Sequence, residues 1–172
     1  QVETDVNSQR VRIHAPIDLG GLGKGYALDQ MRTCLDDFAD FCINAGGDIF
    51  ARGKNLAGEG WRILLEHPLD SKKAMGHVSL EGRALACSNP SRRQWRDRHH
   101  LVNPKTGAPA AKMLSVFVQA PSGIEADAWA TTLFVMGFDR AQQELQTLPI
   151  EALLVSPDKE VFCSEGFDVE FF

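Results

Sequence analysis

Asp127 and Thr131 lie four residues apart in EADAWATTLFVMG (residues 125–137), a stretch with apolar residues at helical spacing. That spacing places the carboxylate and the hydroxyl on one face of the predicted helix. A carboxylate beside a core is costly unless a partner compensates its charge. Two hard oxygen ligands one turn apart suit Mg²⁺. The structural alternative is that Asp127 caps the helix while Thr131 bonds back to a carbonyl one turn earlier.

A second candidate site is DLGGLGKGY (residues 18–26), where glycines precede a predicted helix. Backbone N–H groups in such a turn can approach an anion closely, and the start of a helix favours negative charge. Lys24 adds a cation, so the stretch predicts a phosphate cradle. It is not a P-loop, because Gly25 follows Lys24 where Ser or Thr is required. The alternative is a tight turn with a surface lysine.

The stretch NAGGDI (residues 44–49) places two glycines between the end of a predicted strand and Asp48. One interpretation is a bulge or sharp bend. The other is a point where a flat ligand or a loop approaches the backbone.

A basic run lies within CSNPSRRQWRDRHHLVNPKTGAP (residues 87–109) and ends in His99 and His100. The paired histidines lack further His or Cys at zinc-ligand spacing. The run could be a solvated hairpin. One histidine could instead act as a general base, since an ordinary imidazole titrates near neutrality.

Composition limits the class of protein. The 172 residues suffice for one domain with a real core, and we expect a single domain over residues 1–172. A net charge of −5 argues against a general nucleic-acid binder. No apolar run is long enough to span a membrane. The cysteines form no CxxC pair, which favours buried free thiols over a disulfide framework: Cys34, Cys42, Cys87 and Cys163.

Strands and helices that intermix without a strict βαβ rhythm must position these residues, so we predict an α+β fold with mixed or antiparallel sheets and packed helices. Helices are expected over residues 26–38, 123–136 and 139–148. Gly137 is expected to end the second helix. Strands are expected over residues 11–15, 41–44 continuing beyond 48, 61–68, 77–88, 114–120, 151–156 and 160–164. Residues 89–112 should be irregular, with a turn at PKTG.

These stretches, in this order, resemble the ApbE-type flavin transferases (FAD:protein FMN transferases). IDLGGLGKGYALD resembles the family's DLGGIAKGYAVD, and NAGGDI resembles its NAGGDI. HLVNPKTGAP is similar to HIIDPRTGRP, and SVFVQAPSGIEADAWATTLFVMG to SVTVIAPSAMEADALATALFVMG. The resemblance runs from about residue 10 to 167 and implies an ApbE-like (T-fold-like) domain.

The resemblance implies Mg²⁺-dependent transfer of the FMN moiety of FAD to a Thr or Ser hydroxyl of an acceptor flavoprotein, with release of AMP. It implies that Asp127, Thr131 and the backbone carbonyl of Gly21 bind the metal. Asp18, Lys24 and Leu101 would contact FAD. His100 matches the histidine proposed as general base.

The chain also departs from the family pattern. Asn103 stands where Asp is usual, Ala130 where some members have a second acid, and CSNPS replaces TSG-x-Y. Members usually carry a longer segment ahead of the DLGG motif, so we expect this segment to be lacking here. Two alternatives therefore stand beside the transferase: a non-catalytic flavin-binding or assembly module, and an FAD pyrophosphatase giving FMN and AMP. The acceptor, the oligomeric state and the compartment stay open, although members are often exported, membrane-anchored lipoproteins.

Overall fold

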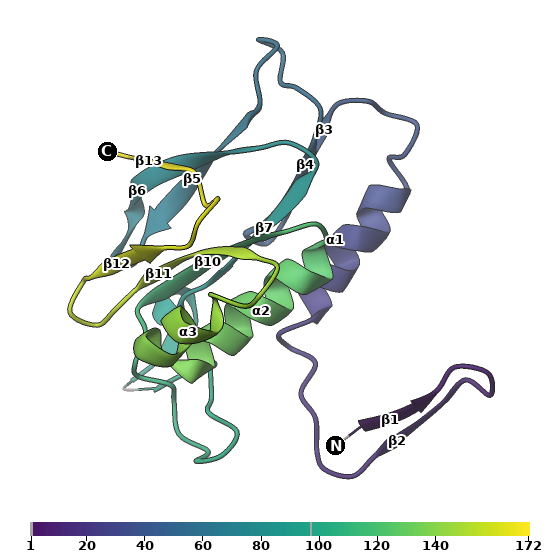
Figure 1. Cartoon of the computed structure of the whole chain (residues 1–172), viewed down its shortest axis with the longest axis vertical. Helices are drawn as coiled ribbons and strands as arrows, with labels where there is room; N and C mark the ends of the chain where they lie inside the picture. Colours follow the sequence, from purple (N-terminus) through teal and green to yellow (C-terminus); the bar gives the residue numbers. More distant parts are fainter. Residues whose placement is uncertain (1, 97) are drawn as a thin grey trace.

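The computed structural model describes residues 2–96 and 98–172, and it has three layers (Figure 1). A six-stranded sheet with the order β12-β11-β10-β7-β4-β3 forms the middle layer. Helices cover one of its faces, and a three-stranded sheet, β13-β6-β5, packs on the other. The α+β prediction is confirmed.

The elements follow one another closely along the chain. The helices are α1 (Gly23–Thr33), α2 (Gly123–Met136), α3 (Phe138–Glu144) and the 3₁₀ turn η1 (Pro90–Arg92). The strands are β1 (Val2–Asp5), β2 (Arg10–Ile13), β3 (Phe41–Ala45), β4 (Asp48–Arg52), β5 (Trp61–His67), β6 (Asp70–Leu80), β7 (Arg83–Ser88), β8 (Gln94–Trp95), β9 (Arg98–His99), β10 (Ser115–Ala120), β11 (Glu151–Val155), β12 (Val161–Cys163) and β13 (Val169–Phe171).

The middle sheet is apolar on both faces because alternate residues of its strands enter two different cores. Ala84, Ala86, Val116 and Val118 belong to the core beneath the helices. Leu85 and Phe117, together with Leu153 and Val155 of β11, belong to the core against the three-stranded sheet. Two buried faces explain why these strands read as apolar runs and not as strict alternations.

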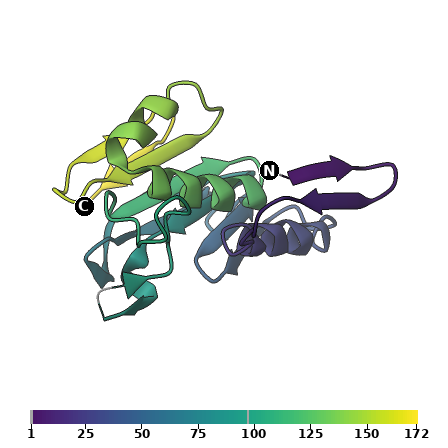
Figure 2. The same ribbon diagram turned by 90° about the horizontal axis from the view of Figure 1, so that it is seen from below.

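Two helices lie side by side on the helical face of the sheet (Figure 2). The first, α1, contacts β3 and β4, while α2 contacts β7 and β10. The side chain of Ser122 accepts a hydrogen bond from the N–H of Glu125, and Gly137, with φ of 83°, ends α2 as predicted. Among the described residues, no helix has both the length and the apolarity needed to cross a membrane.

Several predicted elements need correction. Residues 77–88 are not one strand, because the chain turns at Gly82, with φ of 70°, and its two parts join different sheets. The strand from Phe41 does not continue through Asp48 but reverses there into β4. The four cysteines, all among the described residues, form no disulfide, but Cys34 and Cys42 are exposed and not buried as predicted.

Candidate active site

Helices α1 and α2 touch through their backbones at Gly25 and Gly123. A Cβ on Gly25 would overlap the carbonyl oxygen of Gly123, and one on Gly123 would lie 2.7 Å from the carbonyl oxygen of Gly25. Only glycine permits this close approach. Asp29, one turn after Gly25, accepts hydrogen bonds from the N–H groups of Gly123 (2.7 Å) and Ile124 (3.0 Å). The start of α2 is therefore fixed against α1.

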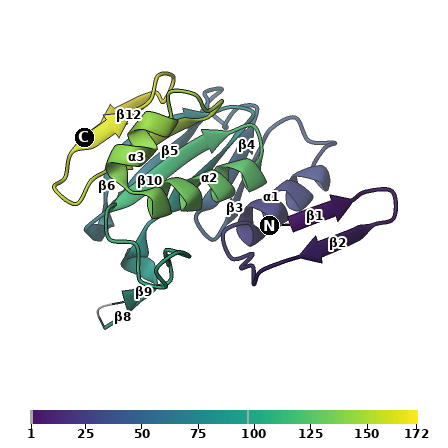
Figure 3. The same cartoon turned by 60° about the horizontal axis from the view of Figure 1, so that its bottom comes forward.

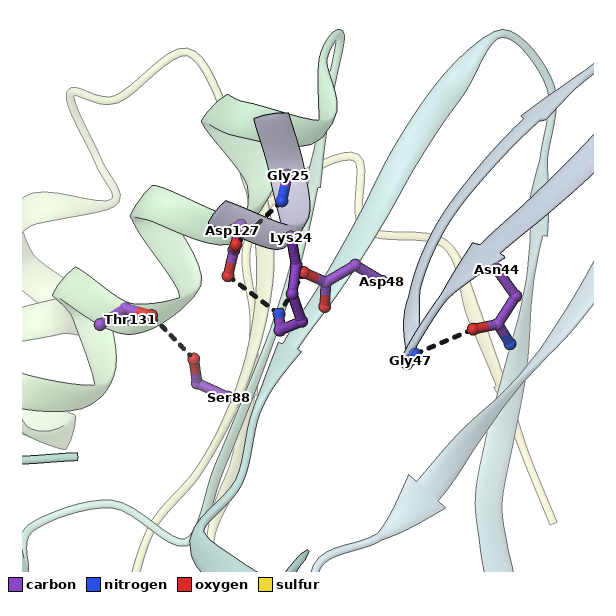
Figure 4. Close-up of polar contacts among 8 residues, drawn as sticks. All are labelled: Lys24, Gly25, Asn44, Gly47, Asp48, Ser88, Asp127 and Thr131. Atoms are coloured by element: carbon purple, nitrogen blue, oxygen red, sulfur yellow. Dashed lines mark hydrogen bonds and ion pairs between the residues drawn. The ribbon is translucent and has the colours of Figure 1, made fainter. Parts of the chain in front are cut away.

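This crossing brings Asp127 to the first turn of α1 (Figure 4). Asp127 is 3% exposed, and its Oδ2 accepts a hydrogen bond of 3.0 Å from the N–H of Gly25. Its Oδ1 lies 3.1 Å from Nζ of Lys24. Asp127 does not cap its helix, because Ser122 is the N-cap. The partner that the burial of this carboxylate demands is the lysine of the predicted phosphate cradle.

Asp48 holds Lys24 from the opposite side (Figure 4). The NAGGD stretch is a two-residue hairpin turn in which Gly46 and Gly47 have φ of 71° and 106°, as such turns require. Asn44 Oδ1 accepts a 2.8 Å hydrogen bond from the N–H of Gly47 and steadies the turn. The hairpin presents Asp48, 2% exposed, in an ion pair with Nζ of Lys24. The sharp bend is thus confirmed, whereas the approach of a flat ligand or a loop to this backbone stays a prediction.

The cluster changes the pKa values of Asp48 and Lys24. Burial raises the pKa of Asp48 to about 6, with the nearby Asp127 adding to the effect and Lys24 opposing it. Burial alone would lower the pKa of Lys24, but the two carboxylates outweigh it and raise that pKa. Lys24 therefore stays charged across the physiological range, buried on one side and open to the site on the other.

Thr131 lies one turn further along α2, against the backbone of Gly21. A Cβ on Gly21 would lie 3.0 Å from Oγ1 of Thr131, so the glycine-rich turn sits on this hydroxyl. Oγ1 of Thr131 also lies 3.4 Å from Oγ of Ser88, at the end of β7. The structure thus brings together Gly21, Lys24, Asp127 and Thr131, and their roles in binding stay predictions.

The donors in this group suit Mg²⁺ in kind. A carboxylate, a hydroxyl and an adjacent backbone are hard oxygen sources, which Mg²⁺ prefers, and the ion completes its shell with water and phosphate oxygens. Within the described residues, no three His, Cys, Asp or Glu side chains form a metal-binding group. The residues therefore fit a cation that shares its shell with a ligand, and not one enclosed by protein.

His100 and His99 face different ways. The ring of His99 is used internally, since its Nε2 bonds to the carbonyl oxygen of Ala110 (3.0 Å) and its Nδ1 accepts from the N–H of Leu101 (3.2 Å). His100 is exposed. Its pKa is lowered by partial burial and by the charges of Arg93, His99 and Lys24. The lowered pKa favours the neutral imidazole, which is the form that can accept a proton.

Comparison with known proteins identifies the family. A model of the ApbE family matches residues 1–154. The chain belongs to the ApbE family.

Individual relatives share both sequence and fold with this ApbE-family chain. It is 30% identical over 154 residues to the FAD:protein FMN transferase of Klebsiella pneumoniae (strain 342), an alignment that covers 85% of this chain and 44% of the relative. The ApbE protein of Thermotoga maritima superposes with a TM-score of 0.85 at 31% identity, covering 96% of this chain and 57% of the other. The flavin transferase ApbE of Vibrio cholerae gives 0.84 at 26% identity, with coverages of 96% and 56%. The chain thus spans about half the length of these relatives.

The remaining residues that the ApbE resemblance singles out have local surroundings of their own. Asp18 is exposed, and its Oδ1 accepts a 2.7 Å hydrogen bond from the N–H of Gly20. Leu101 is buried in the core between the helices and the sheet. Its contact with FAD stays a prediction. Asn103, which stands where ApbE proteins usually have Asp, accepts a 2.9 Å bond from the N–H of Lys105 at the predicted turn. The amide oxygen thus performs the turn function that a carboxylate would.

Asn89 is the clearest departure from the ApbE pattern. Its Oδ1 accepts a 2.8 Å hydrogen bond from the N–H of Ser91, which fixes the orientation of the amide. Its Nδ2 is buried and has no partner among the described residues. A donor left over beside Ser88 and Thr131 is suited to an acceptor atom of a ligand.

The sequence motifs did not indicate a role for Asp48, Ser88 or Asp29. The signal for Asp48 was present, because Gly-Gly at a strand end predicts a hairpin that aims the next residue. The signal for Asp29 was its four-residue spacing from Gly25 on one helix face. Ser88 carried no signal, because its contact with Thr131 depends on how the sheet and α2 pack.

Proposed function

We propose that this chain forms the transfer site of an FAD:protein FMN transferase, which moves the FMN moiety of FAD to a Thr or Ser hydroxyl of an acceptor flavoprotein and releases AMP with the help of Mg²⁺. The observation that carries the proposal is the buried cluster of Lys24, Asp48 and Asp127 beside Thr131, at the first turn of α1. Relatives of known name support the reaction, since the Klebsiella protein is an FAD:protein FMN transferase.

Lys24 supplies the electrostatic part of the mechanism. In phosphoryl transfer, charge gathers on the oxygens of the transferred group, and fixed positive groups stabilise it. The ammonium of Lys24 is held by two carboxylates, yet its side chain remains 36% exposed. Its charge is therefore positioned before the substrate arrives, and little reorganisation is needed.

His100 supplies the base. A threonine or serine hydroxyl is a weak nucleophile near neutral pH, so a positioned base helps it to attack. The hydroxyl oxygen bonds to the phosphorus that carries riboflavin, and the bond from this phosphorus to the oxygen bridging to AMP breaks. The hydroxyl proton passes to the neutral imidazole of His100, and AMP leaves with the bridging oxygen. The lowered pKa of His100 keeps the imidazole neutral before attack.

Asp127, Thr131 and the backbone of Gly21 are the residues that would hold Mg²⁺. A divalent cation held there would neutralise pyrophosphate charge and polarise the phosphoryl oxygens. Without a cation, the N–H of Gly25 and the ammonium of Lys24 compensate the charge of the buried Asp127 carboxylate. The side chain thus needs no cation for the chain to fold.

Product analysis tests the proposal against its alternatives. The chain is incubated with FAD and Mg²⁺, with and without an acceptor protein, and AMP and FMN are measured by chromatography. The proposal predicts AMP release that depends on the acceptor, without an equal amount of free FMN. Equal release of AMP and FMN without an acceptor would indicate hydrolysis, and FAD bound but unchanged would indicate a binding module.

A further inference from the structure

Asp48 has a buried carboxylate that the reaction does not use. It is 2% exposed, pairs with Nζ of Lys24, and accepts a hydrogen bond from the backbone N–H of Cys87. The residue begins β4, which pairs with β7 on one side and with β3 on the other. Sheet and hairpin turn therefore fix this carboxylate, whereas Lys24 sits on a flexible stem.

Asp127 has two competing uses. Its Oδ1 lies 3.1 Å from Nζ of Lys24, while its Oδ2 is taken by the N–H of Gly25. A cation bound to the same carboxylate would repel the ammonium of Lys24. Without a second carboxylate to hold it, Lys24 would either compete with the cation for Asp127 or turn its ammonium into solvent.

We propose that Asp48 is a positioning residue that holds Lys24 in the site and so leaves Asp127 available to a divalent cation. Figure 4 shows the geometry, with the lysine between a carboxylate from the sheet and another from α2. This inference rests on the proposed function for its cation, but the Asp48–Lys24 contact stands without it. Asp48 does not act on the substrate. It acts through Lys24.

The first experiment needs no metal. Asp127→Asn removes the charge of Asp127 and imitates its departure from Lys24, and the Lys24 ammonium is observed by ¹H–¹⁵N NMR after assignment with Lys24→Arg. A held, partly buried ammonium exchanges its protons slowly and is visible, whereas a solvated one is not. We expect the signal to persist in Asp127→Asn and to vanish in Asp48→Asn/Asp127→Asn. Loss in the single variant, or persistence in the double one, would overturn the anchoring role.

The second experiment measures Mg²⁺ affinity by calorimetry in the presence of FAD. Residues that support metal ligands typically change affinity by about 10–100-fold when removed, and we expect Asp48→Asn to weaken Mg²⁺ binding by that factor. The exposed Asp158, changed to Asn, removes an equal charge outside the site and should leave affinity unchanged. Asp48→Glu keeps the charge and should restore part of the affinity.

A double-mutant cycle separates positioning from a general charge effect. In a Lys24→Met background, Asp48→Asn should have little effect on Mg²⁺ affinity, because the residue it positions is gone. An equal loss in both backgrounds would overturn the proposal. If Asp48→Asn alone does not fold, Lys24→Met and Lys24→Met/Asp48→Asn still show whether Asp48 affects Mg²⁺ affinity apart from Lys24, and a loss of affinity within that pair would overturn the proposal. Absence of Mg²⁺ binding by the unchanged protein would count against the proposed function, while the NMR result would still decide the anchoring of Lys24.

Discussion

At Asp127, two donors replace the water that a carboxylate loses on burial: the N–H of Gly25 and the ammonium of Lys24. The sequence shows that a compensating partner is necessary, because Asp127 lies on the apolar side of a helix. It does not show which partner, since Lys24 is distant along the chain. Only the crossing of α1 and α2 brings the two motifs together.

The first prediction concerns the stability contributed by this contact. Asp127→Asn leaves Lys24 with one carboxylate partner and should lower the free energy of unfolding by about 1–3 kcal/mol. Urea unfolding followed by circular dichroism measures the change, with Asp158→Asn as a control for lost charge. An unchanged midpoint for Asp127→Asn would show that the Lys24–Asp127 contact contributes nothing to folding.

The second prediction concerns pH. Partial burial first, and then neighbouring positive charges, lower the pKa of His100 below its ordinary value of about 6.5. The neutral base form therefore predominates above this lowered pKa. The transfer rate should rise as the pH increases through the pKa of His100, and it should reach its plateau at a lower pH than with an ordinary histidine.

His100→Gln provides the control for the pH profile. This substitution should abolish transfer, and with it the acid limb of the pH profile, which is the rise in rate at low pH. FAD binding should persist. An acid limb above pH 7, or one retained in His100→Gln, would remove His100 as the base.

At the scale of elements, the sequence predicted best those bounds of helices that depend on neighbouring residues. The bounds of α2 were predicted residue for residue, because Gly137 interrupts the apolar period at its end. Helix α1 begins earlier than predicted, at Gly23, since glycines reduce helix propensity but packing on α2 and the sheet compensates. Strand β13 was not predicted, because its partners in β6 are distant in sequence. Residues 70–76 of β6 were not predicted either, although they pair with the neighbouring β5, because this polar stretch lacks the apolar pattern of a strand.

The third prediction tests the α1–α2 crossing. Gly25→Ala places a methyl group against the carbonyl of Gly123, so the helices must separate, at a cost of about 1–3 kcal/mol of stability. FAD binding should weaken too, because Lys24 and Asp127 move apart.

Gly23→Ala is the matched control in the same helix, since its new Cβ meets no atom within 4 Å. It should leave stability unchanged within about 0.5 kcal/mol. Thermal melts of both variants and FAD titrations provide the comparison. Equal effects of the two substitutions would show that the crossing does not set the site.

At the scale of the whole molecule, the three layers serve the site by fixing three of its elements against one another. The site lies where α1, α2 and the β3–β4 hairpin meet, above the edge of the middle sheet formed by β4 and β3. The hairpin of β1 and β2 instead extends away from these layers (Figure 3). Its strands are exposed throughout, and its apolar residues include Val2, Val11 and Ile13.

The fourth prediction follows from this separation. A two-stranded hairpin is marginal by itself, and this one buries nothing against the layers, so removing residues 1–14 should change the free energy of unfolding by less than about 0.5 kcal/mol. Urea unfolding of the shortened chain measures this. A large loss of stability would show that the hairpin packs on the domain in solution.

The central claim is covalent transfer, and the intact mass of an acceptor tests it most directly. An acceptor with an Asp-x-x-(Ser/Thr)-Gly-Ala-(Ser/Thr) site is incubated with this chain, FAD and Mg²⁺, and its mass is recorded with and without chelator. The account predicts an acceptor heavier by one FMN group, absent with chelator and absent with Lys24→Ala. An acceptor of unchanged mass, while the chain binds FAD and Mg²⁺, would contradict it.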